Sequence, residues 1–504
     1  MTPRSLMTHS THQFIAHRPI INIPVLLRLI GLLLLIESGF LLIPLGTALY
    51  YGENDWGAFL FTFLLSALGG GAMAFLIHPN TSAIGKRDGF LLTALVWVVF
   101  SLFGMLPFII IEESSLSVSA AFFEAMSGFT TTGASTMRSI DHLPHSLIIW
   151  RSTMQWIGGM GIILFTLAVL PMLNHSGGMQ MFNAEVTGIT HDKLRPRISQ
   201  TAKSLWTIYV TLTLILFVLL LIGPMDVFNA VCYAFSIMST GGFCTTDAGL
   251  ELWGSDYIES VSTVFMFIGG VSFTLIYKAV HRDFHAVWAN DVFRTYIAII
   301  VVCYFLFLIN NLVGGCVGDF KQATLDPLFQ IVSMVSSTGF EAPDFSRWGV
   351  FVLAISLVLM FFGACAGSTS GGAKIDRMIY MLKNCHNEIK RCIHPNNILT
   401  VRVNGKVIPH EIISKVVAFL CLYVLIILVG GITLTAMGIP LIDAFFSSFS
   451  CISNTGLSAG ITGYGTTFHI IPDAGKWILA LIMLIGRLEL FTVLLLFTPS
   501  FWKK

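Results

Sequence analysis

Short hydroxyl-rich stretches that close on glycine occur four times in the chain, roughly 100 residues apart. We call residues 127–133, 236–242, 333–339 and 450–456 segments 1 to 4. Each opens with Ser and carries Ser or Thr three residues before its closing Gly. A cation that crosses a membrane needs oxygens in place of its hydration shell, and rings of backbone carbonyls from short non-helical segments supply them. Such an internal repeat predicts four loops around one cation pathway.

The last three residues of each segment are the expected carbonyl ligands. Glycine suits the end of such a loop because it tolerates a positive φ and a close approach of backbone. Small residues also pack membrane helices closely, which is the alternative explanation. That alternative leaves four hydroxyl-rich segments at matched positions unexplained. The predicted ligands are Thr131, Thr132, Gly133, Thr240, Gly241, Gly242, Ser337, Thr338, Gly339, Asn454, Thr455 and Gly456.

The composition indicates a membrane protein. The 504 residues are 55% hydrophobic and 11% charged, and the mean hydropathy is +0.81. Nine cysteines stand singly without CxxC spacing, so they predict no metal site or disulfide framework. The net charge of +1 and the lack of a polybasic tract give no reason to expect nucleic acid as a partner. No HExxH or Ser/His/Asp cluster lies in an apolar run, which argues against an enzyme.

Each segment follows a short helical stretch and lies between two long apolar ones. The predicted long, short and long helices are residues 90–111, 117–126 and 147–173 for segment 1; 205–222, 229–238 and 257–280 for segment 2; 293–313, 326–335 and 349–381 for segment 3; and 412–437, 443–452 and 476–497 for segment 4. About 20 apolar residues cross a bilayer. With two further apolar runs at 25–50 and 56–77, the sequence predicts an all-α polytopic membrane protein with ten transmembrane helices and four half-spanning pore helices around one central pore.

The predicted organisation has six parts. They are a cytoplasmic N-terminal stretch (1–24), a two-helix module (25–80), and four pore repeats at 88–175, 200–283, 291–395 and 410–504. Asn229, Asp326 and Asp443 are good N-cap residues, so we expect them to begin three of the short helices. The carbonyl ends of those helices would then point toward the pore and favour a cation.

Lys and Arg residues indicate the orientation of the chain. With a cytoplasmic N-terminus, the inner connections hold most of the basic residues, including the dense stretch 377–415. The opposite face carries many acids and few basic residues. By the positive-inside rule, both termini are expected in the cytoplasm, and the acids at the outer mouth would concentrate cations there.

Two features inside apolar runs bear on conduction. Arg487 is predicted in the middle of the last span, and a charge at that depth normally faces a cavity or a partner. It is expected either to line the pathway and limit ion occupancy or to tie structure together through carbonyls. Glu37 and Glu124 are also intramembrane acids, for which we favour structural pairing over a proton relay.

The second feature is the glycine-rich stretch 363–374, which interrupts an apolar run. Its four glycines disfavour a helix by about 1 kcal/mol each. We expect a broken helix with a loosely packed, mobile gating loop under the carbonyl ring. The predicted gating residues are Arg487, Gly367, Ser368, Thr369, Ser370, Gly371, Gly372 and Lys374.

These residues resemble a known family. The stretches FFEAMSGFTTTG (122–133) and WRSTMQWIGGMG (150–161), the break at 363–374 and GRLE (486–489) resemble the Trk/Ktr/HKT superfamily of potassium transporters, and most closely its TrkH/TrkG branch. The resemblance covers the chain from about residue 25. In that family the closing glycines select potassium; all four are Gly here. Gly241, which doubles the glycine of segment 2, is a departure from the other three segments.

The resemblance implies potassium uptake across the bacterial inner (plasma) membrane through a channel-like pore. It further implies a homodimer in membrane lipid, gated by a cytosolic TrkA-like nucleotide-binding ring. Potassium is then the transported ion, held at the ring, and no cofactor is expected. A proton- or sodium-coupled potassium symporter remains the alternative, because broken helices also form the binding sites of coupled transporters.

Overall fold

The computed structural model describes residues 21–79, 85–173, 198–314, 320–342, 348–397, 399–457 and 467–503. These residues are mostly helical, as predicted. Their one β-structure is a small antiparallel ribbon of β1 (Arg402–Val403) and β2 (Lys406–Val407). Within the described residues, six helices are long and apolar enough to cross a membrane, or eight if each of two bent pairs is one span. The count of ten spanning helices therefore stays a prediction.

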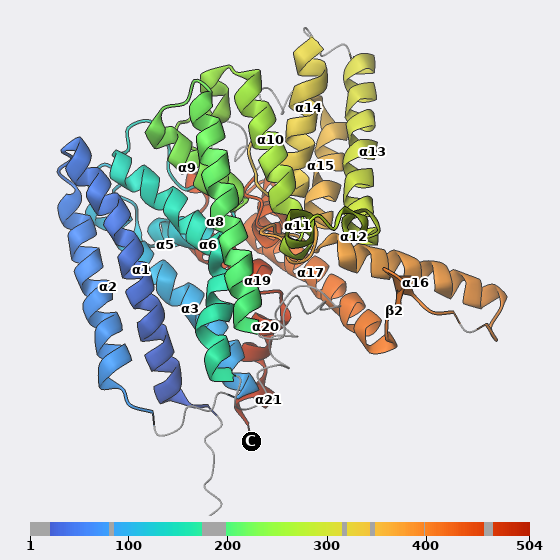
Figure 1. The fold of residues 1–504 in the computed structure, drawn as a ribbon, viewed down its shortest axis with the longest axis horizontal. Helices are drawn as coiled ribbons and strands as arrows, with labels where there is room; N and C mark the ends of the chain where they lie inside the picture. The colour runs from blue at the N-terminus through green and yellow to red at the C-terminus, as the bar shows by residue number, and fades with distance from the viewer. Residues whose placement is uncertain are drawn as a thin grey trace, which may run out of the picture.

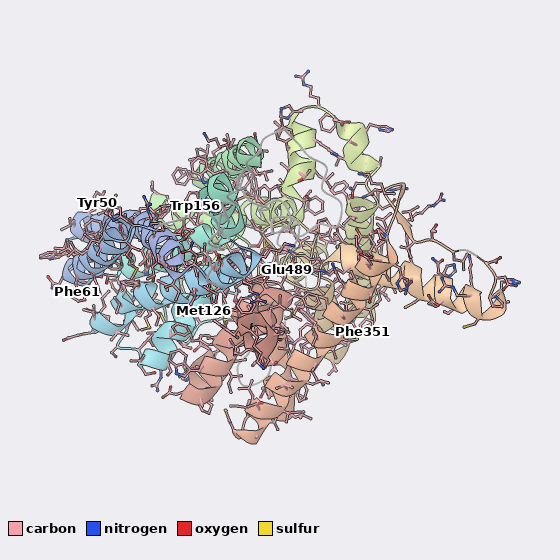
Figure 2. The ribbon with its side chains drawn as sticks, turned by 90° about the horizontal axis from the view of Figure 1, so that it is seen from below. Tyr50, Phe61, Met126, Trp156, Phe351 and Glu489 are labelled. Atoms are coloured by element: carbon pink, nitrogen blue, oxygen red, sulfur yellow. The ribbon has the colours of Figure 1, made fainter. Side chains whose placement is uncertain are left out.

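Helices α1 (Ile23–Tyr51) and α2 (Trp56–Leu76) lie side by side at one edge of the molecule (Figures 1 and 2). A Cβ on Gly31 would lie 2.6 Å from the carbonyl oxygen of Gly70, so glycine permits this close contact. Glu53, in the connection, accepts the backbone N–H groups of His145 (2.7 Å) and Ser146 (3.1 Å). The pair is thus docked on the free N–H groups at the start of α6 (His145–Leu173).

From residue 85 the chain repeats one order of elements four times: long helix, short helix, segment, long helix. The first group is α3 (Lys86–Gly104), α4 (Leu106–Ile110), α5 (Val118–Phe129) and α6 (His145–Leu173). The second is α8 (Ile198–Ile222), α9 (Val227–Met238), η1 (Gly249–Trp253), α10 (Asp256–Gly270), α11 (Phe273–Val280) and α12 (Phe284–Trp288). The third is α13 (Asp291–Gly314), α14 (Phe320–Val335), α15 (Val350–Phe362) and α16 (Ile375–Ile393). The fourth is α17 (His410–Ala436), α18 (Leu441–Ser453), η4 (Phe468–Ile470), α19 (Asp473–Arg487), α20 (Phe491–Leu494), η5 (Leu495–Phe497) and α21 (Pro499–Trp502).

The helix that follows the segment is broken in three of the four groups. α10 and α11 meet at 107°, and α19 and the α20–η5 stretch meet at 116°. The predicted unbroken helices at 257–280 and 476–497 are therefore wrong; only the break at 363–374 was expected. The break in the second group follows the Gly269–Gly270 pair. The break in the fourth group lies where Glu489 and Leu490 take positive φ values. α6, by contrast, runs without interruption from His145 to Leu173.

The predicted helix caps were also wrong in position. α9 is capped by Asp226, whose carboxylate accepts the N–H of Asn229, so Asn229 lies inside the first turn. Asp443 lies in the first turn of α18, which begins after Pro440. Asp326 lies inside α14, which starts at Phe320. Acidic and amide residues near a helix start are common both at the cap and within the first turn, so composition alone does not fix the first residue.

Candidate functional site

The four segments share one backbone conformation. The residue two before the closing glycine has a left-handed φ of 52° to 55° in every segment, and the closing glycine has a φ of 77° to 86°. In segments 1, 2 and 3 the residue two before the closing glycine is Thr or Ser, for which a left-handed φ is unusual. Such agreement at matched positions indicates one design used four times. The residues are Thr131, Thr240, Ser337 and Asn454, with Gly133, Gly242, Gly339 and Gly456.

The closing glycines join the segments into a closed ring. A Cβ added to Gly133 would overlap the carbonyl oxygen of Gly241 in segment 2. In the same way, a Cβ on Gly242 would overlap the Thr338 oxygen of segment 3, and a Cβ on Gly339 would overlap the Thr455 oxygen of segment 4. A Cβ on Gly456 would overlap the Thr132 oxygen of segment 1. The order 1–2–3–4–1 closes on itself. Each glycine therefore allows a carbonyl of the next segment to approach the ring.

Hydrogen bonds within each segment fix the shape of the turn. The N–H before the closing glycine donates to the carbonyl of the opening serine over 2.8 to 3.1 Å in all four segments. Hydroxyl pairs two residues apart, such as Thr130 with Thr132 at 2.8 Å, add a second bond in segments 1, 3 and 4. These bonds use the N–H before each closing glycine. The closing glycines are partly exposed, while the residue before each of them is buried.

A polar residue nine positions before the closing glycine holds the chain that leaves the ring in segments 1 and 3. Glu124 accepts the N–H of Thr136 at 2.8 Å, and Gln330 accepts the N–H of Ala342 at 2.6 Å. Arg151 pairs with Glu124 at 2.9 Å, both side chains being at most 1% exposed. The expected structural pairing of Glu124 therefore agrees with the structure. Glu37, also buried, has no hydrogen-bond partner among the described residues.

Arg151 connects the stretches of chain that directly follow segments 1 and 2. Besides Glu124, its guanidinium donates to Ser135 Oγ and to the carbonyl of Cys244, each at 3.2 Å, and lies 4.1 Å from the centre of the Phe243 ring. Sequence reasoning quoted Arg151 within the stretch 150–161 and gave it no role at the segments. Its position one turn before Gln155 in the WRSTMQW stretch was the available signal.

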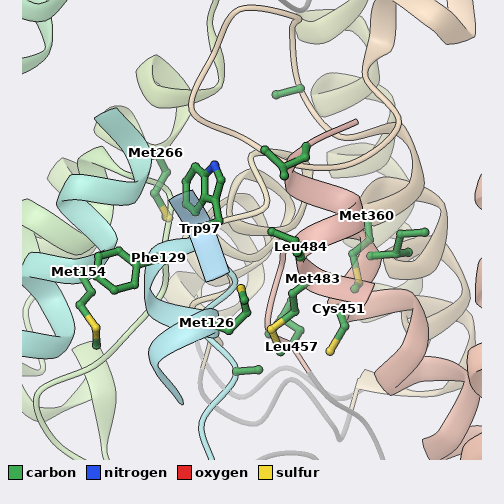
Figure 3. Packing of buried hydrophobic residues seen from close by; sticks show 14 of the residues in the cluster. Trp97, Met126, Phe129, Met154, Met266, Met360, Cys451, Leu457, Met483 and Leu484 are labelled. Carbon is green, nitrogen blue, oxygen red and sulfur yellow. The ribbon is translucent and has the colours of Figure 1, made fainter. Parts of the chain in front are cut away.

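Apolar side chains pack behind the ring. Met154 lies beside Phe129 and Gly128, and Phe129 also packs on Gly104 (Figure 3). A Cβ on Gly158 would overlap the carbonyl of Phe129. The close contact of α6 with segment 1 therefore depends on small residues on both elements.

The stretch 363–374 lies against segments 2, 3 and 4. Gly371 N–H donates to Ser337 Oγ at 2.5 Å, and Thr240 Oγ1 donates to Thr369 Oγ1 at 3.2 Å. A Cβ on Gly371 would overlap the carbonyl of Ser453. The predicted position next to the ring therefore agrees with the structure. The expected loose packing was wrong, because the whole stretch is buried apart from three partly exposed residues, Ala366, Gly367 and Gly372.

Arg487 is the last residue of α19, at the break, rather than in mid-helix as predicted. Its guanidinium donates to the carbonyl of Thr369 in the loop and to the carbonyl of Gly158 in α6, each at 2.8 Å. Lys374, at the other end of the loop, donates to the carbonyl of Ser370. Arg487 therefore fastens the loop to the first and fourth groups, as the structural alternative required.

Comparison with known proteins identifies the family. The family model described as "TrkH: Cation transport protein" matches residues 57–294 and 286–504. The Trk system potassium uptake protein TrkH of Escherichia coli (strain K12) is 37% identical over 486 residues, 95% of this chain and 99% of that protein. The chain belongs to the TrkH family.

Other relatives support the same family. The Trk system potassium uptake protein TrkG of Escherichia coli (strain K12) is 30% identical over 96% of this chain and 99% of its own length. The crystal structure of the potassium transporter TrkH from Vibrio parahaemolyticus has a TM-score of 0.86 and 34% identity, covering 95% of this chain and 100% of that one. The predicted membership of the TrkH/TrkG branch is confirmed. These relatives are membrane transport proteins rather than enzymes, and the chain is a multi-pass membrane protein.

A second ion pair joins the stretch after the loop to the fourth group of this TrkH-family chain. Arg377 in α16 pairs with Glu489 at 2.6 Å, and its guanidinium lies 4.1 Å from the centre of the Phe419 ring in α17. Figure 2 shows Glu489 near the middle of the molecule. α16 then projects away from the body together with β2 (Figure 1). Movement of α16 would therefore reach the break after Arg487 directly.

Proposed function

We propose that the chain takes up potassium through a channel-like pore whose selectivity filter is the ring of four segments. The observation that carries this proposal is the closed order of contacts, in which each closing glycine admits a carbonyl oxygen of the next segment. Carbonyls of the last three residues of each segment replace the ion's hydration shell. The relatives named as potassium uptake proteins support potassium as the ion.

The gate in this proposal is the loop 363–374 with Arg487. The loop crosses the inner side of segments 2 to 4, and Arg487 holds it there through the Thr369 carbonyl. A cytosolic TrkA-like nucleotide-binding ring would act through α16, which is continuous with the loop and basic along its exposed part. Binding opens the pore only if the TrkA-like ring has higher affinity for the open arrangement.

We further propose a homodimer in the lipid of the bacterial inner membrane, with both termini in the cytoplasm. The support for this orientation is the distribution of Lys and Arg, which are concentrated at 377–415 and in the other inner connections. The six parts predicted from the sequence then correspond to a cytoplasmic N-terminal stretch (1–24), a two-helix module outside the pore (25–80) and four quarters of one pore (88–175, 200–283, 291–395 and 410–504). Coupled symport with protons or sodium is the alternative function, favoured by the broken helices.

The test is uptake of potassium by cells that lack their own potassium-uptake systems. Cells that express this chain should grow at low potassium, whereas cells with Gly133→Val should not, because the valine side chain overlaps the Gly241 carbonyl. Gly46→Val is the matched control, since nothing lies within 4 Å of a Cβ on Gly46. Equal growth with Gly133→Val at equal membrane expression would contradict the proposed pathway.

A further inference from the structure

Segment 2 lacks a side chain that the other three segments carry. The residue before the closing glycine is Thr132, Thr338 or Thr455 in segments 1, 3 and 4, but Gly241 in segment 2. The backbone does not require glycine here, because Gly241 is absent from the positive-φ residues. Space does require it. A Cβ on Gly241 would lie 2.5 Å from Oε1 and 2.8 Å from Nε2 of Gln155.

The carboxamide of Gln155 occupies the place of the missing threonine. Gln155 lies on α6, the long helix after segment 1, and is fully buried. Its Nε2 donates to the carbonyl of Gly241 at 2.7 Å, and its Oε1 accepts the N–H of Phe243 at 3.2 Å. One side chain therefore holds the residues on both sides of the closing Gly242. The Gly241 carbonyl is also the oxygen that Gly133 admits to the ring.

We infer that Gln155 is a positioning residue that determines ion specificity at the corner between segments 1 and 2. In segments 1, 3 and 4 a hydroxyl pair within the segment sets the turn. In segment 2 a side chain from a neighbouring helix does so, and it donates directly to the Gly241 carbonyl, a proposed ion ligand. A carbonyl held by such a donor moves less when an ion of another size arrives. This inference rests on the proposed function of the ring as a potassium filter.

Two single variants separate the roles of the Gln155 amide. Gln155→Leu removes both hydrogen bonds at similar size, and Gln155→Glu keeps an acceptor for the Phe243 N–H while it loses the donor to Gly241. We expect potassium/sodium discrimination, measured from ion-dependent uptake or current, to fall about tenfold in Gln155→Leu, the effect of roughly one buried hydrogen bond. Gln155→Glu should also reduce it, since a carboxylate repels the carbonyl.

A third variant converts segment 2 to the pattern of the others. Gly241→Thr alone should fail to assemble, because the added side chain overlaps the Gln155 amide. Gln155→Ala/Gly241→Thr empties that space and lets the introduced hydroxyl pair with Ser239, as Thr132 pairs with Thr130. The double variant should recover membrane expression and most of the discrimination. It also keeps the inference testable if Gln155→Leu fails to fold.

Gly339→Ser is measured alongside, because it tests the ring without touching Gln155. Unchanged discrimination in Gln155→Leu together with a loss in Gly339→Ser would overturn the role of Gln155 and leave the filter standing. A double variant that stays unfolded or unselective would overturn it as well. Unchanged discrimination in both Gln155→Leu and Gly339→Ser would instead contradict the proposed filter.

Discussion

Two physical effects act against a side chain at the closing glycines. A side chain at a left-handed φ costs about 1–2 kcal/mol, and this chain tolerates such a cost at several positions, among them Thr131 and Thr240. Overlap with a carbonyl of the next segment costs more than this, because the backbone of two segments must move to relieve it. Crowding in the ring, rather than backbone strain, therefore decides why glycine stands at these four positions.

Gly339→Ser should lower potassium/sodium discrimination by about tenfold or more, because the added Cβ displaces the Thr455 carbonyl. The ion then loses an interaction about as strong as one buried hydrogen bond. Selectivity is measured from competing uptake of the two ions. Gly405→Ser is the control: Gly405 also has a positive φ, of 72°, but nothing lies within 4 Å of its Cβ. The assignment of these carbonyls as ligands would be contradicted if only Gly405→Ser lost discrimination, or if both variants kept it.

Arg487→Gln should raise potassium flux several-fold in well-folded protein. Glutamine is too short to reach both the Thr369 and Gly158 carbonyls, so the loop loses its fastening to α6. The measurement is flux per molecule in vesicles, normalised to protein in the membrane. If the variant does not assemble while Arg487→Lys does, the residue serves structure only and the gating role is wrong.

At the residue scale, the sequence predicted the segments but not what supports them. Glycine and hydroxyl patterns are local, so segments 1 to 4 are recognisable within seven residues. Gln155 acts on Gly241 from 86 positions away, and Arg151 reaches Cys244 from 93 away. Residues so far apart in the sequence form no local pattern that would predict these contacts. The doubled glycine of segment 2 was visible as a departure, but its reason required the neighbouring helix.

At the element scale, the broken helices place polar groups beneath the ring. α10 ends at Gly270, α15 at Phe362 and α19 at Arg487. The first two breaks are bonded to each other, because the Gly270 carbonyl accepts the N–H of Cys365 and the Phe273 N–H donates to the Gly367 carbonyl. The sequence indicated the third-group break because four glycines disfavour a helix. It missed the other two, since two glycines or an Arg-Leu-Glu turn within an apolar run look like an ordinary span.

Trimming Ser368–Gly372 should raise potassium flux even without a cytosolic partner, because the shortened loop no longer reaches segments 2 to 4. If the partner normally supplies about 3 kcal/mol of differential affinity, the open-to-closed ratio changes roughly 150-fold. Flux is measured with and without the partner. Thr369→Val is a milder companion variant that removes the hydroxyl bonds to Thr240 and Gly269 but keeps the carbonyl bound by Arg487. Well-expressed trimmed protein that conducts no faster would place the barrier elsewhere.

At the scale of the whole molecule, the four groups form the ring and the α1–α2 pair is attached from outside. The attachment includes the hydrogen bond from the His145 N–H to Glu53 and the stacking of Tyr51 on His145, whose ring centres are 4.1 Å apart. Partial burial raises the pKa of the neighbouring Asp55 carboxyl, although the hydrogen bond from Ser146 opposes this shift. α6, the unbroken helix, thus carries the outer module at one end and Gln155 and Gly158 beside the ring.

The final prediction separates a channel from a coupled transporter. If ions pass the ring without a coupled partner ion, the reversal potential of purified protein in a bilayer follows the potassium gradient alone, by about 59 mV for each tenfold change at 25 °C. It should not move when the proton or sodium gradient is changed at fixed potassium. Gly339→Ser shows that the assay would detect a second ion, because its weaker discrimination should make the reversal potential sensitive to sodium. In the unaltered chain, a shift with pH or sodium would mean that those ions travel with potassium, and the broken helices beneath the ring would then be a coupling site rather than a gate.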